Sequence, residues 1–140
     1  MSYRDAPALH PLIYVHGDLA CAVDRESGRE LWRFSSPCAF TRVLLAYDRV
    51  YLLDKNAMVH ALDARDGTVL GSVQIEPSGT GGALIAEDGR IYVATTHGAC
   101  AITPDGKMLW TWPKPDVWGT QILPGLALPG QTCQPDFRDV

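Results

Sequence analysis

Short apolar runs separated by polar residues and glycines dominate the hydrophobic pattern of this chain. Residues 12–15, 50–53 and 91–93 are rich in β-branched and aromatic side chains, and each run ends in a polar or glycine-bearing segment. Runs of this length and composition, bounded by turn residues, predict β-strands. We find no convincing run with the 3.6-residue spacing of a helix, so the pattern predicts an all-β chain.

The chain repeats itself with a period of about 40 residues. A second short strand follows each apolar run and ends at Asp24, Asp63 or Thr103. The glycines of the next tight turn and the leucines of the third strand each recur at intervals of 39 residues: Gly28, Gly67 and Gly106, and Leu31, Leu70 and Leu109. The tyrosines Tyr14, Tyr51 and Tyr92 are 37 and 41 residues apart, which predicts loops of different length between the units.

A fourth strand follows a longer loop in each unit, at residues 42–46, 83–86 and 122–123. Four strands in about 40 residues is the period of a β-propeller blade. We therefore expect one repeat domain over residues 1–140. It would contain three four-stranded units at about 11–47, 48–87 and 88–128, followed by a tail at 129–140.

One pattern recurs in these units: Ile/Val-Tyr, then Ala-Leu-Asp, then Gly, then Leu-Trp. It resembles the pyrroloquinoline-quinone-like (PQQ-like) propeller repeat, best over residues 51–70 and 22–34, and the resemblance covers about residues 11–125. The resemblance implies that a tryptophan, here Trp32 and Trp110, fills the wedge between neighbouring blades. Gly71 stands at that position in the middle unit, so we expect a gap there or another side chain in its place.

Size and charge exclude some classes of protein. The chain has 140 residues, a mass of 15.3 kDa and a net charge of −4, which fits one domain with a real core. The negative charge argues against a protein that grips nucleic-acid phosphates. No apolar run approaches the ~20 residues of a membrane helix. We expect neither nucleic acid nor membrane among the partners.

Cysteine usage bears on the compartment. Residues 1–7 lack the basic and apolar stretches of a secretory signal. None of the four cysteines, Cys21, Cys38, Cys100 and Cys133, belongs to a CxxC motif. We therefore expect free thiols and a cytoplasmic location, with disulfides in an oxidising compartment as the alternative.

The sequence offers few residues for catalysis. Quinone dehydrogenases that resemble these repeats have about eight blades, a calcium site, adjacent disulfide-bonded cysteines and an export signal. This chain has three units, no adjacent cysteines and no such signal at residues 1–7, so we expect no enzyme activity, cofactor or metal site. Cys21, His60 and Cys100 share one repeat position, but separate blades hold them too far apart for a common ion. No Ser/His/Asp order can be assigned from the sequence.

The two rims of the predicted blades differ in composition. One rim is charged and includes Arg25, Glu26, Arg29, Asp48, Arg49, Arg65, Asp66, Glu87, Asp88 and Arg90. The opposite rim carries the long loops and is the candidate partner-binding surface, with His16, Phe40, Lys55, His97, Trp112 and Trp118. Aromatic side chains in irregular loops on a rigid scaffold are typical of recognition sites. As the alternative, the two tryptophans only cover the last blade.

These observations predict a non-catalytic scaffold, or protein–protein interaction module, that holds an unidentified protein partner. A small-ligand or quinone-cofactor-binding propeller is the alternative. Because propellers close with 4–8 blades, three units leave exposed edges. We therefore expect a homodimer that closes a six-bladed ring, with residues 119–128 supplying the strand that completes the first blade of the neighbouring copy.

Overall fold

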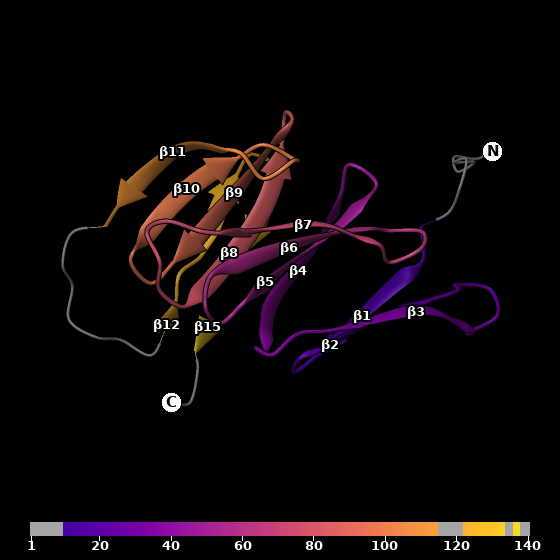
Figure 1. Ribbon diagram of the computed structural model, residues 1–140. Coiled ribbons are helices and arrows are strands. Elements are labelled where there is room, and N and C mark those ends of the chain that lie inside the picture. The colour runs from indigo at the N-terminus through magenta and orange to yellow at the C-terminus, as the bar shows by residue number, and fades with distance from the viewer. Residues whose placement is uncertain (1–9, 115–121, 134–135, 138–140) are drawn as a thin grey trace.

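The computed structural model describes residues 10–114, 122–133 and 136–137, and these form an all-β fold. Three antiparallel sheets lie one after another across the molecule in sequence order (Figure 1). The first contains β1 (Leu12–His16), β2 (Leu19–Val23) and β3 (Glu30–Ser35). The second contains β4 (Phe40–Ala46), β5 (Arg49–Asp54), β6 (Met58–Asp63) and β7 (Val69–Gln74). The third contains β8 (Gly81–Glu87), β9 (Arg90–Thr95), β10 (Gly98–Ile102) and β11 (Met108–Pro113).

The strand predicted to end each unit begins the next sheet instead. β4 pairs with β5, and β8 pairs with β9, through loops of two residues. Both central residues of each loop have positive φ: Tyr47 (56°) and Asp48 (59°), and Asp88 (56°) and Gly89 (71°). Such primed turns match the twist of two adjacent strands and hold them in one hairpin. The predicted units at 11–47 and 48–87 therefore do not coincide with the sheets.

The first sheet has only three described strands, and β1 forms its edge. β1 carries the exposed side chains of Leu12, Tyr14 and His16. In the second and third sheets the equivalent strands, β5 and β9, are covered on that edge by β4 and β8. The first sheet is thus the only one of the three whose described strands lack this fourth member.

The C-terminal segment forms two short two-stranded sheets. β13 (Leu126–Leu128) pairs with β14 (Gln131–Cys133), and β12 (Ile122–Leu123) pairs with β15 (Asp136–Phe137). Of these strands, β12, β13 and β14 lie against β8 of the third sheet. Residues 122–123 and 126–128 of the strand predicted to close a neighbour's ring therefore pair within their own chain, with residues assigned to a tail; residues 119–121 lie outside the described part.

Two apolar clusters hold the sheets together. One lies between the first and second sheets: Ala20, Ala22, Trp32, Phe40, Val50, Leu52, Leu62 and Ala64. The other lies between the second and third sheets: Tyr51, Leu53, Ala57, Val59, Ile75, Leu84, Ile91, Val93, Cys100 and Ile102. The second sheet contributes one face to each cluster, which fixes its place between the first and third sheets.

The register of the first hairpin places Tyr14 on the opposite face from its sequence counterparts. The structurally equivalent pairs are Ile13 with Ala22, Tyr51 with Ala61 and Tyr92 with Ala101. Successive residues of a strand point to opposite faces, so Ile13 takes the place of Tyr51 and Tyr14 points away. Tyr14 is 56% exposed, whereas Tyr51 is 1% exposed.

Candidate functional site

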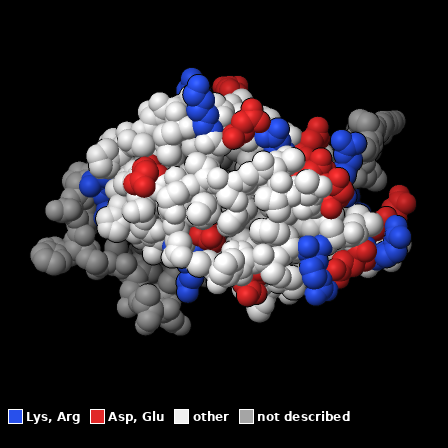
Figure 2. Space-filling view, in the orientation of Figure 1, with Lys and Arg blue, Asp and Glu red and all other residues white. Residues whose placement is uncertain are grey.

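Most of the predicted partner-binding rim is exposed. His16, Lys55 and His97 are exposed at equivalent hairpin ends of the three sheets. Trp112 is 54% exposed near the end of β11. Trp118 lies outside the described residues. In the view of Figure 2, acidic and basic side chains gather toward the right-hand end and upper edge of the molecule, and the middle shows few of them.

Phe40 does not belong to that accessible rim, which corrects the sequence prediction. It is 8% exposed and its ring centroid lies 6.1 Å from that of Phe34, with the two rings stacked. The His60 ring meets it edge-on at 6.1 Å. Phe40 is buried because it begins β4, the strand that joins the second sheet and not a loop of the first.

Trp32 fills the wedge between the first and second sheets. Its side chain is buried, and its indole Nε1 donates a hydrogen bond to the Ala64 carbonyl oxygen at 3.0 Å. The ring lies against Gly67, where an added Cβ would come within 2.7 Å of two ring carbons. Only glycine gives the indole this close approach to the turn of the next sheet.

Gly71 leaves the corresponding wedge open between the second and third sheets. It pairs with Ala61 in the register in which Trp32 pairs with Ala22. A hollow of about 400 Å³ is present there, lined by Arg49, Tyr51, Val59, Ala61, Leu70, Gly71, Ser72, Val73, Ile102, Pro104, Asp105 and Gly106. The sequence left open either a gap or another side chain at this position, and the structure has the gap.

One end of the hollow is polar. The Pro104 carbonyl oxygen accepts hydrogen bonds from Arg49 Nη1 at 2.8 Å and from the Tyr51 hydroxyl at 2.9 Å. Arg49 Nη1 also donates to Asp105 Oδ1 at 2.9 Å, and this bond is the main cause of the raised pKa of Arg49. Burial raises the pKa of Tyr51, so its hydroxyl stays protonated at neutral pH. These polar groups surround the carbonyl that corresponds to Ala64 in the filled wedge.

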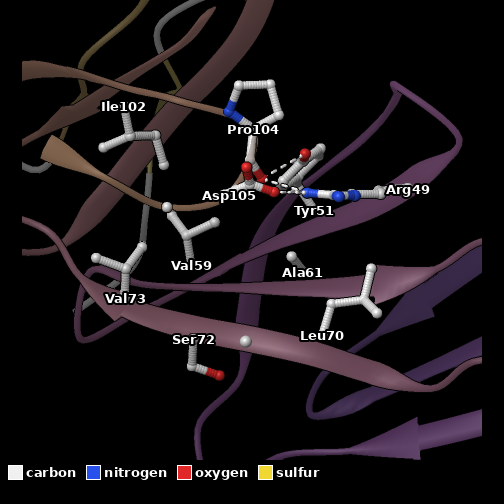
Figure 3. Close-up of a pocket in the computed structure, with 12 residues that line it drawn as sticks. Arg49, Tyr51, Val59, Ala61, Leu70, Ser72, Val73, Ile102, Pro104 and Asp105 are labelled. Atoms are coloured by element: carbon white, nitrogen blue, oxygen red, sulfur yellow. Dashed lines mark hydrogen bonds and ion pairs between the residues drawn. The ribbon is translucent and has the colours of Figure 1, made fainter. Parts of the chain in front are cut away.

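The other end of the hollow is apolar. Val59, Val73 and Ile102 face it from β6, β7 and β10 (Figure 3). Leu70, Gly71 and Ser72 are exposed on β7, the edge strand of the second sheet, so the hollow opens to solvent along that edge. Apolar walls with a few convergent polar groups are the usual composition of a ligand pocket.

Trp110, the third predicted wedge residue, is only half covered. It pairs with Ala101 in the same register as the other two positions and lies 6.2 Å from the Tyr92 ring. The C-terminal strands pack on β8 and β9, and Trp110 stays 44% exposed on β11.

A Ser–His–Asp contact is present in the second sheet. His60 Nδ1 lies 2.8 Å from the Ser72 hydroxyl, and His60 Nε2 lies 3.2 Å from Asp54 Oδ2. Asp54 is 3% exposed, and its Oδ1 accepts the backbone N–H groups of Asn56 and Met58. The carboxylate thereby fixes the β5–β6 turn, and the His60 ring packs between Phe34 and Phe40, which we interpret as a structural network.

The described residues contain neither a metal-binding cluster nor a membrane-spanning helix. Among the described residues, no three His, Cys, Asp or Glu side chains are placed to bind a metal ion together. In the same residues, no helix is long and apolar enough to cross a membrane. Sequence reasoning missed Tyr51 and Asp105 as site residues and placed Arg49 on a solvated rim; Gly71 was the signal in the sequence that pointed to this wedge.

Antiparallel sheets of three or four described strands stacked in series, with the Trp32 indole between the first two, are consistent with the blades of a β-propeller. The family described as outer membrane protein assembly factor BamB matches residues 10–111, and the chain belongs to this family of PQQ-like propeller repeats. A search of curated protein sequences finds no significant match.

Solved structures share the fold at low sequence identity. BamB from Moraxella catarrhalis aligns with a TM-score of 0.64 and 16% identity over 84% of this chain and 39% of that chain. The computationally designed Ika4 protein aligns with a TM-score of 0.68 and 13% identity over 94% and 87%. The Neurospora crassa Pan2 WD40 domain gives 0.59 and 16% over 81% and 40%. This chain thus spans about two fifths of the natural structures named here.

Proposed function

We propose that this chain is a non-catalytic β-propeller scaffold that holds a protein partner. The observation that carries the proposal is the pair of tryptophans on one face of β11, Trp110 and Trp112, which are 44% and 54% exposed. Large apolar and aromatic side chains clustered on a rigid strand mark protein-interaction surfaces. The propeller fold shared with BamB and a WD40 domain supports the same class of function.

A capture experiment tests this proposal. The chain is immobilised, and the proteins retained from its native host are identified by mass spectrometry. We expect Trp112→Ser to weaken retention of a specific partner at least tenfold. Leu31→Ser, which removes a similarly exposed residue (40%) from β3, serves as the matched control and should retain it. Equal retention by both variants would refute the assignment of the partner surface to β11.

We also propose that two copies close a ring by joining their free edges. Among the described strands, none covers the edge of β1 as β4 and β8 cover those of the next two sheets, and open edges favour association. Because residues 122–123 and 126–128 already pair within their own chain, the C-terminal strands would meet β1 of the other copy as a unit. Light scattering with gel filtration should give about twice 15.3 kDa. Tyr14→Lys, which places a charge on that edge, should give the monomer mass.

We propose that the protein works in a reducing, cytoplasmic compartment. All four cysteines lie in the described residues and are unbonded to one another. The number of thiols that react after denaturation without reductant tests this proposal. A small ligand is the second candidate for the binding partner, and the 400 Å³ hollow is the observation that favours it.

A further inference from the structure

The hollow beside Gly71 has a twin in the same molecule, and the twin contains an indole ring. Trp32 projects over Ala22, against Gly67 of the next sheet, and donates to the Ala64 carbonyl. The open wedge repeats these walls with Ala61, Gly106 and the Pro104 carbonyl. The chain therefore shows what chemical group such walls accommodate.

The two wedges differ in the indole ring and in the groups that donate to the turn carbonyl, which are Arg49 and Tyr51 in the open wedge. Gly71 contributes no side chain, and an added Cβ there would have no neighbour within 4 Å. An added Cβ on Gly106 would lie 3.7 Å from Val73, whereas on Gly67 it would overlap the Trp32 ring. Val73 thus narrows the open wedge without filling it, and a volume of about 400 Å³ remains.

We propose that this wedge binds the side chain of a tryptophan presented by the partner protein. Val59, Val73 and Ile102 would cover the ring faces. The Asp105 carboxylate, whose other lone pairs are available beside its bond to Arg49, would accept the indole N–H. The Arg49 guanidinium adds a cation next to the ring, a favourable contact for tryptophan. Tryptophan is also one of the side chains enriched among interface hot spots.

The mouth of the wedge suits a group that arrives on a polypeptide. It opens along β7, whose outer edge is unpaired among the described strands. A partner segment running beside β7 would place its side chain at Gly71, as β3 places Trp32 in the first wedge. This inference rests on the proposed scaffold function and names one anchor of the partner.

The test titrates the full-length, 15N-labelled chain with N-acetyl-L-tryptophanamide, a mimic of a tryptophan within a peptide. We expect saturable NMR shifts of the Gly71, Ala61 and Gly106 amides with a Kd on the order of 1 mM, the range for a small uncharged fragment. N-acetyl-L-leucinamide should bind at least tenfold more weakly. Free indole should bind at the same amides.

Gly71→Trp supplies the missing ring from the chain itself. It should weaken the binding of N-acetyl-L-tryptophanamide at least tenfold, since Gly71 has a φ outside the positive region and open space at its Cβ position. Val69→Trp adds the same side chain at an exposed residue of β7 outside the wedge lining, and should leave binding within twofold. If Gly71→Trp does not fold, Gly71→Val provides a smaller filler with the same expected direction.

Three results would overturn the inference: no saturable shift, undiminished binding by a folded Gly71 variant, or binding of free indole without binding of the amide. The last result would assign the wedge to a small ligand. The titration uses no partner protein, so its failure leaves the capture experiment on Trp112 intact, and a failure of capture leaves the titration intact.

Discussion

The indole of Trp32 donates a hydrogen bond to the backbone oxygen of Ala64 at 3.0 Å. This bond joins β3 of the first sheet to the turn between β6 and β7 of the second. The bond lies within an apolar cluster, where water does not compete with it. In the next wedge the same carbonyl position accepts Arg49 and Tyr51 instead. Neighbouring sheets are thus connected through the same carbonyl position by an indole in one wedge and by a guanidinium and a phenol in the next.

Truncation of Trp32 should strongly destabilise the chain. Trp32→Ala removes a buried aromatic side chain, a change that costs about 3–5 kcal/mol of unfolding free energy. Trp32→Phe keeps an aromatic ring but loses the bond to Ala64, and we expect a loss of about 1–2 kcal/mol. Urea denaturation followed by circular dichroism measures both. Trp112→Ala, at an exposed residue, should change stability by less than about 1 kcal/mol. Equal effects of Trp32→Ala and Trp112→Ala would contradict the wedge role.

Tyr51→Phe should slightly lower the stability of the chain, because it removes a contact between the second and third sheets. The substitution removes only the hydroxyl that donates to Pro104, so we expect a loss of about 1 kcal/mol in unfolding free energy. The matched change Tyr14→Phe affects a tyrosine that is 56% exposed and should be neutral. Thermal unfolding compares the two. A neutral Tyr51→Phe would show that Arg49 alone satisfies the carbonyl.

Asp54→Ala should be among the most damaging polar substitutions. The buried carboxylate accepts two backbone N–H groups and the His60 ring, so its loss leaves three donors without their partner. We expect a loss of about 2–4 kcal/mol. Asp18→Ala, at an exposed turn residue, is the control and should stay within about 0.5 kcal/mol. If both variants unfold at the same urea concentration as the parent, the network is not structural.

Thiol titration should distinguish two pairs of cysteines. In the native protein Cys38 and Cys133 are partly exposed, whereas Cys21 and Cys100 are buried. A chromogenic disulfide reagent should therefore react rapidly with about two thiols and, after denaturation without reductant, with four. A denatured count near zero would indicate disulfides and an oxidising compartment.

Alkaline pH should weaken the fold through Cys100. Burial raises the pKa of this thiol from 9.0 to about 11, so the folded state retains a proton that the unfolded state has lost. The stability is fully present below pH 9 and is lost as the pH rises toward 11. Cys100→Ala should flatten the decline of unfolding free energy between pH 9 and 11. Cys38→Ala should leave that decline unchanged, and an identical slope in all three proteins would contradict the assignment.

The sequence by itself determined the strands, the repeat and the wedge positions. Glycine turns at intervals of 39 residues and short β-branched runs act locally, because each turn needs its own backbone conformation and each strand its own side chains. For the same reason the replacement of tryptophan by Gly71 was sufficient to predict a gap or a substitute. Trp32, Gly71 and Trp110 do share one register in the structure.

Only the tertiary structure decided which strands share a sheet and which faces are buried. The sequence predicts residues 42–46 as the last strand of the first unit, but the positive-φ turn at Tyr47 and Asp48 folds this strand onto β5 and buries Phe40. A shift of one residue in hairpin register turns Tyr14 outward, because side chains alternate along a strand. The pocket likewise needs Arg49, Tyr51 and Asp105 from two sheets, and a contact between residues more than 50 positions apart has no local signature in the sequence.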